Sequence, residues 1–196
     1  MSPVNTTNAN TVVNLKSGSK PGKTRVSGTL NIKGLIQNTC EDILQRYERK
    51  EQHQAREEAK KLLEKYPDSL VVKKLEVLIL YRDRKYLEAY KKIKALLKSA
   101  PKDARMINMQ GMIQRQLGLF KEAVSSYKLA ISIQPSLSDP YNNLAIIYRY
   151  FGKKDLAIKN FRSAISKNKN FSSAFYNLSC MKGYKFTKNE INAVEA

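Results

Sequence analysis

Small and apolar side chains recur along the chain at intervals of 34 residues. One set at this interval consists of Ala55, Ala89, Ala123 and Ala157. A second set consists of Pro67, Pro101 and Pro135. Because proline fixes φ and disfavours the helical region for the residue before it, each proline predicts the end of a helix. The spacing predicts repeats over residues 36–69, 70–103, 104–137 and 138–171, with a partial fifth repeat over 172–186.

Two further columns of this frame pair small residues with large ones. Position 8 of successive repeats holds Ile43, Val77, Gly111, Ala145 and Ser179. Position 24 holds Ala59, Ile93, Tyr127 and Phe161. A small side chain opposite a large one lets two helices approach closely. Each repeat is therefore predicted to form two packed helices joined by a turn.

A helix–turn–helix repeat of 34 residues resembles the tetratricopeptide repeat (TPR) family. The resemblance covers residues 36–186 and is closest in GMIQRQLGLFKEAVSSYKLAISIQP and YNNLAIIYRYFGKKDLAIKNFRSAI. It implies an all-α fold, a right-handed α-solenoid of about four and a half hairpins whose first helices line a concave groove. Asp42 and Arg46 stand where the family favours leucine and an aromatic residue. The first helix is therefore expected to pack poorly or to lie differently.

The first 35 residues differ in composition from the repeats. They are rich in Asn, Thr, Ser and Gly and lack helical periodicity, which predicts a disordered arm over residues 1–35. All its charged side chains are positive: Lys16, Lys20, Lys23, Arg25 and Lys33. The arm either contacts an anionic partner or is a solvated leader, and the sequence leaves both interpretations open.

The C-terminal segment departs from the 34-residue frame. Thr187 and Glu190 form a capping-box pattern, which predicts a short helix within residues 187–196. The stretch FYNLSCMKGYKFTKNEINAVEA also resembles the junction between tetratricopeptide repeats and a sulfotransferase domain. That resemblance implies an alternative function, an N-terminal targeting or interaction module of a larger sulfotransferase-type enzyme.

Composition is that of an ordinary helical domain. Of the 196 residues, 42% are hydrophobic, and glycine and proline are few. No apolar run approaches the roughly 18 residues needed to span a bilayer, so we expect a cytoplasmic protein. Cys40 and Cys180 would lie at opposite ends of a solenoid and cannot bridge within one chain, which suits a reducing compartment.

The formal net charge of +19 raises the question of nucleic acid. Many lysines, however, fall on predicted second helices, where a solvated face is the ordinary explanation; examples are Lys91, Lys92, Lys94 and Lys98. The chain has no zinc-ligand cluster or RNA-recognition aromatic motif. Non-specific nucleic-acid binding is therefore an alternative that the sequence does not favour.

The sequence offers no catalytic constellation. The single histidine, His53, lies in the charged run EQHQAREEAKK, and carboxylates such as Glu57 occur at helical spacing from lysines such as Lys61. Glycine-rich phosphate loops, cysteine–histidine spacings and nucleophile motifs are not found. We expect no enzymatic activity in the chain as given, no cofactor and no metal site.

The resemblance also implies where a partner would bind. In this family the groove is lined by first-helix positions 2, 5, 6, 9, 12 and 13. These positions here include Lys74, Tyr81, Arg82, Arg105, Asn108, Met112, Arg115, Asn142, Asn143, Arg149, Tyr150, Tyr176, Asn177 and Tyr184. The carboxylate clamp that some members use is absent, because only Asn143 fits its pattern.

Asparagines are the most distinctive of these candidate groove residues. Asn143 and Asn177 occupy position 6 of successive repeats, with Asn142 and Asn108 nearby. A side-chain amide both donates and accepts, so it can pair with the backbone of an extended peptide. Alternatively, these asparagines cap or solvate helix surfaces. The sequence predicts a protein-interaction scaffold that binds an extended, acidic peptide in the groove.

Overall fold

The computed structural model describes residues 32–188 and residue 191. Within this part of the chain all regular structure is helical. The helices are α1 (Ile32–Glu48), α2 (Gln52–Lys65), α3 (Leu70–Arg82), α4 (Tyr86–Ser99), α5 (Ala104–Gln116), α6 (Phe120–Ile133), α7 (Ser138–Tyr150), α8 (Lys154–Lys167) and α9 (Ser172–Ser179). The expected basic arm up to residue 31 and most of the expected C-terminal helix lie outside the described residues.

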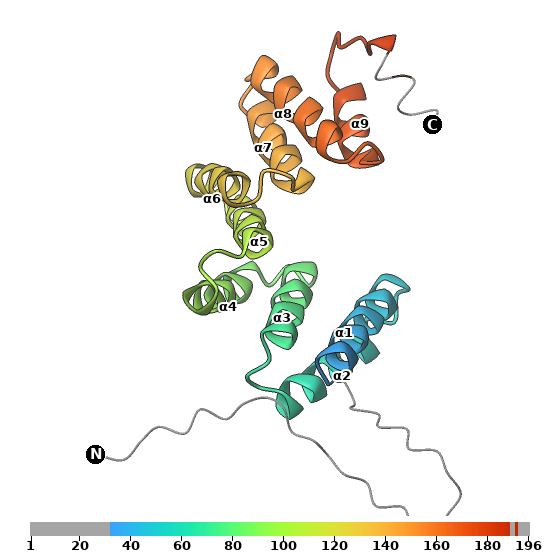
Figure 1. Cartoon of the computed structure of the whole chain (residues 1–196), viewed down its shortest axis with the longest axis vertical. Coiled ribbons are helices and arrows are strands. Elements are labelled where there is room, and N and C mark those ends of the chain that lie inside the picture. Colours follow the sequence, from blue (N-terminus) through green and yellow to red (C-terminus); the bar gives the residue numbers. More distant parts are fainter. Residues whose placement is uncertain (1–31, 189–190, 192–196) are drawn as a thin grey trace, which may run out of the picture.

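The helices follow one another as hairpins along a curved path, from α1 and α2 to α9 (Figure 1). Each helix packs on its neighbours in sequence, and first helices also touch across repeats: α1 with α3, α5 with α7, and α7 with α9. Second helices contact one another less, so the first helices form the inner side of the curve. The predicted all-α solenoid is confirmed.

The turns between repeats follow the proline column. Helices α2, α4 and α6 each end two residues before Pro67, Pro101 and Pro135, respectively. The turns within hairpins have a column of their own at position 15. Gly118 and Gly152 have positive φ values of 76° and 70°. In the first two repeats, Lys50 and Arg84 adopt the same left-handed conformation (φ 72° and 61°), which is unfavourable for a residue with a Cβ.

The alanine column lies in the buried core of each hairpin. Ala55, Ala89, Ala123 and Ala157 are all fully buried. Helix α5 approaches α6 so closely that there is no room even for a methyl group at Gly111, because a Cβ built there would lie 2.5 Å from Tyr127 Cε1. Tyr127 and Phe161 are fully buried opposite the small residues of α5 and α7, and these two hairpins pack over a larger surface than α1/α2 and α3/α4.

Helix α1 begins at Ile32, four residues before the expected start of the first repeat. It buries Ile36, Cys40, Ile43 and Tyr47 against the second and third helices. The two residues that depart from the family pattern do not prevent this packing. Arg46 reaches across the hairpin, and its Nη1 lies 2.5 Å from the carboxylate of Glu58 on α2. A charged pair thus replaces the expected aromatic contact.

Asp83, at the end of α3, joins the first two repeats. Its carboxylate accepts hydrogen bonds from Arg56 Nε at 2.8 Å and Arg56 Nη2 at 2.7 Å, and also from the Tyr47 hydroxyl. The hydrogen bonds from Arg56, followed by that from Tyr47, hold the pKa of Asp83 below its usual value despite partial burial. The ionised carboxylate is therefore the form that stabilises the fold.

This network predicts a pH-dependent contribution to stability. A lowered folded-state pKa adds stability above the unfolded carboxyl pKa of about 3.9, and this stability is lost as pH falls through the folded value. Asp83→Asn should lower the melting temperature at pH 7 by about 2–6 °C, and the gap to the wild type should narrow as the pH falls below about 3.9 and the folded-state carboxylate is protonated. The matched control is Asp68→Asn, since the Asp68 side chain is fully exposed. A gap independent of pH would contradict this assignment.

The contact between Gly111 and Tyr127 predicts strong coupling between α5 and α6. Gly111→Ala should destabilise the protein by about 1–3 kcal/mol, because the ring of Tyr127 must move. Tyr127→Ile in the same chain places the residue that the second repeat has at this position, Ile93, opposite the new methyl group and should recover part of that loss. Denaturant unfolding of the two single variants and the double variant measures the coupling. Additive effects would show that the two residues do not share this contact.

Candidate peptide-binding groove

Two pairs of asparagines connect the first helices of the last three repeats. Asn143 on α7 donates from Nδ2 to Asn108 Oδ1 on α5 at 3.0 Å. Asn177 on α9 donates in the same way to Asn142 Oδ1 on α7 at 3.2 Å. We call these two pairs the asparagine rungs. Each rung joins position 5 of one repeat to position 6 of the next.

In each rung one amide NH2 group and one amide C=O bond to each other, which leaves the other NH2 and the other C=O of the pair. Asn142 Nδ2, Asn143 Oδ1 and Asn177 Oδ1 have no further partner among the described residues, while Asn108 Nδ2 makes a weak contact with the Met112 sulfur at 3.9 Å. The four side chains are 5–9% exposed. In the described part of the chain, the fully buried polar side-chain atoms without a partner are Arg115 Nε and Tyr127 Oη. The remaining amide atoms of the rungs therefore still reach solvent.

Three arginines of the candidate groove lie on the same helices as the rungs. Arg149 donates to the backbone carbonyl of Asn177 at 3.4 Å and lies 5.9 Å from the ring centroid of Phe161. Arg115 lies beside the hydroxyl of Tyr127, whose pKa is raised by burial. Arg105, near the start of α5, is exposed. None of the three forms an ion pair within the described residues, and Arg105 is the most exposed of them, whereas Arg115 and Arg149 are partly buried.

The basic residues of the N-terminal half are engaged differently from the sequence expectation. Arg82 pairs with Glu48 at 2.8 Å, and Lys74 pairs with Asp103 at 2.5 Å. The first pair links the first two repeats, and the second joins α3 to the N-cap residue of α5. Carboxylates of the chain itself thus occupy the two side chains that were expected to face a partner.

The candidate tyrosines fall into two groups. Tyr150, the last residue of α7, and Tyr176 on α9 are each 70% exposed. Tyr81 accepts a hydrogen bond from Gln116 at 3.3 Å. Tyr184 does not lie on a first helix, because α9 ends at Ser179, and its hydroxyl accepts a hydrogen bond from Arg162 on α8 at 3.1 Å. The structure therefore places Tyr184 against a second helix, away from the rungs.

Sequence reasoning missed the partners within each rung. It treated the asparagines as single groups facing a peptide, whereas Asn108 pairs with Asn143 and Asn142 with Asn177. The signal was present: both pairs are separated by 35 residues, one more than the repeat length. Where two first helices cross, position 5 of one therefore lies beside position 6 of the next.

Comparison with protein families assigns the repeats. The family of Psidin N-terminal TPR repeats regions matches residues 39–171. The chain belongs to this tetratricopeptide family. The matched region ends before the segment that resembles a sulfotransferase junction. A comparison with curated proteins gives no match.

Solved structures with the same fold are TPR proteins of low sequence identity. The structure of pilF from Pseudomonas aeruginosa has a TM-score of 0.62 at 20% identity, over 74% of this chain and 66% of that chain. MamA from Desulfovibrio magneticus RS-1 has a TM-score of 0.57 at 14% identity, over 69% and 77%. YrrB, a TPR protein with an unusual peptide-binding site, has a TM-score of 0.56 at 16% identity, over 67% and 68%. These likenesses show the fold.

Two features are absent from the part of the chain that the structure describes. None of the helices there is long and apolar enough to cross a membrane. No cluster of three or more His, Cys, Asp or Glu side chains suited to a metal ion occurs in that part of the chain.

Proposed function

We propose that the protein is an interaction scaffold that holds an extended, acidic segment of a partner protein along α5, α7 and α9. The observation that carries the proposal is the pair of asparagine rungs, each of which leaves amide groups open to solvent. A free amide N–H and a free amide C=O match the C=O and N–H of a peptide backbone. Such pairing holds a chain without reading its side chains.

The spacing of the helices suits an extended occupant. Packed helices lie about 8–10 Å apart, and an extended chain advances about 3.3 Å per residue. Successive rungs would therefore address backbone groups about three residues apart. The side chains between them are left to contact the helices on either side.

The acidic character of the partner follows from the arginines beside the rungs. Arg105, Arg115 and Arg149 lack a carboxylate partner within the described residues, and a guanidinium can hold a carboxylate through two hydrogen bonds. Each contact at a solvated surface contributes about 1 kcal/mol, so we expect roughly micromolar affinity that weakens with salt. The exposed rings of Tyr150 and Tyr176 offer apolar contact area to the same segment.

The fold supports this proposal at a coarser level. The chain belongs to a TPR family, and one solved structure of this fold is a TPR protein with a peptide-binding site. Stacked repeats create extended inner surfaces that suit long, thin partners. Within this class of partners, the open amide groups of the rungs favour a segment whose backbone is extended.

Removal of a whole rung tests the proposal. Asn142→Ala/Asn177→Ala deletes both members of one pair, so neither buried amide is left orphaned and the fold should persist. Its affinity for a fluorescent acidic peptide should fall about tenfold, as expected for the loss of two hydrogen bonds. The matched control is Asn160→Ala on α8, whose amide bonds only to the carbonyl of Leu156. Melting curves check that both variants are folded.

Two further probes distinguish backbone recognition from bulk charge. A peptide that is N-methylated at alternate residues should lose affinity, whereas a peptide with its acidic residues reordered should keep it. A single-stranded oligonucleotide should show a steeper salt slope, and its binding should ignore the rung. Unchanged peptide affinity in the rung variant would contradict the proposal.

A further inference from the structure

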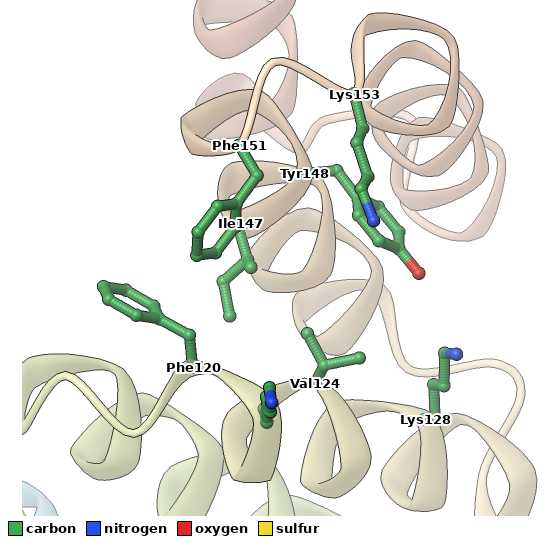
Figure 2. A pocket seen from close by; sticks show the side chains of 8 residues that line it. Phe120, Val124, Lys128, Ile147, Tyr148, Phe151 and Lys153 are labelled. Carbon is green, nitrogen blue, oxygen red and sulfur yellow. The ribbon is translucent and has the colours of Figure 1, made fainter.

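A cleft of about 500 Å³ lies between α6 and α7, and its lining side chains come from both helices (Figure 2). None of its lining residues is among the candidate groove residues, although Tyr150 of the groove stacks on Phe120 at its edge. Ile147 lies on α7, and Phe151 directly follows the last residue of this helix, four residues further along, so the two side chains point to the same side. At about 100° per residue, this side lies roughly half a turn from Asn142 and Arg149, whereas Asn143 lies near it.

The floor of the cleft is apolar. Val124 on α6 and Ile147 on α7 face each other across it, with Phe120 and Phe151 at one end (Figure 2). The rings of Phe120 and Phe151 meet edge to face, with their centroids 5.3 Å apart. Phe151 nevertheless stays 53% exposed. Exposed aromatic rings beside a recess are typical of surfaces that receive an apolar side chain.

The rim of the cleft is positive. Lys121, Lys128 and Lys153 line it, all three are exposed, and none forms an ion pair within the described part of the chain. No carboxylate lines the cleft. An apolar floor with a rim of unpaired lysines is complementary to a segment that carries an apolar side chain between acidic ones.

We propose that this cleft is a second docking site, which binds a short acidic segment of a partner protein through one aromatic or long aliphatic anchor. The anchor lies on Val124 and Ile147 between the two phenylalanine rings and the lysines. Phe120 and Lys128 are eight residues apart on α6, a distance of about 12 Å along the helix. About four residues of extended chain fill that length.

This inference is independent of the function proposed for the groove, and it differs in what is recognised. The groove would hold a backbone through amide groups, whereas the cleft would read one apolar side chain and its acidic neighbours. A basic segment is excluded by like charge. Residues 1–31 of this chain carry only positive charged side chains and so cannot be the occupant.

The test uses the full chain and a fluorescein-labelled six-residue peptide that has one phenylalanine between pairs of acidic residues. Anisotropy titrations should show binding that weakens about tenfold in Lys121→Glu/Lys128→Glu. Lys91→Glu/Lys98→Glu changes the net charge equally on the distant helix α4 and should keep the wild-type affinity. Phe151→Ser, at a half-exposed position that tolerates polar residues, should also weaken binding.

Two comparisons decide the outcome. The same peptide with serine in place of phenylalanine should bind about tenfold more weakly, while the rung variant Asn142→Ala/Asn177→Ala should bind the original peptide normally. Equal losses in the two lysine double variants would show that only bulk charge matters and would overturn the proposal. The proposal would also be overturned if the serine peptide bound as tightly as the original peptide. Loss of binding in the rung variant would overturn it as well.

Discussion

The close approach of the two helices in the third and fourth hairpins is the constraint on which the rest of the structure depends. It requires a residue with almost no side chain on the first helix and a large ring on the second, as in Gly111 with Tyr127 and Ala145 with Phe161. These pairs make α5/α6 and α7/α8 the most extensively packed hairpins. A rigid hairpin then presents its first helix to the next repeat at a fixed position.

That fixed position permits short side chains to bridge repeats. An asparagine amide can reach its partner only when the two helices are held close, and the rungs measure 3.0 and 3.2 Å. In the N-terminal hairpins, Ile43 and Val77 occupy the equivalent small-residue position. There the repeats are joined by longer charged side chains instead, as in the pair of Arg82 with Glu48. The groove therefore has an amide-lined half and an ion-paired half.

Helix α7 contributes to both candidate surfaces. Asn142 and Arg149 lie on one side of it, whereas Asn143 is four residues before Ile147 and so lies close to the side that lines the cleft with α6. Tyr150 lies near the junction of the two, because its exposed ring stacks on Phe120 with centroids 5.2 Å apart. A chain with a net charge of +19 thus places its unpaired cations beside two surfaces of different chemistry.

The sequence predicted the fold well because the fold is a repetition of one local unit. The spacing of the alanines and prolines alone fixed the hairpins and the turns between them, and the structure confirms both. Contacts between repeats were harder to predict, since they depend on how helices cross. The rungs are offset by one position from the repeat, Arg82 pairs with Glu48 at the end of the first helix of the preceding repeat, and Tyr184 lies beyond the end of α9.

Amide side-chain NMR measures the central claim most directly. Each rung asparagine has an Nδ2 group that gives its own pair of signals, and Asn142 Nδ2 has no partner among the described residues. Addition of an acidic, extended peptide should shift the side-chain signals of Asn142 and Asn108 and slow their exchange with water. The signals of Asn160, on the opposite side of the hairpin, should not move. Shifts confined to the cleft between α6 and α7, with the rung signals unchanged, would contradict the account.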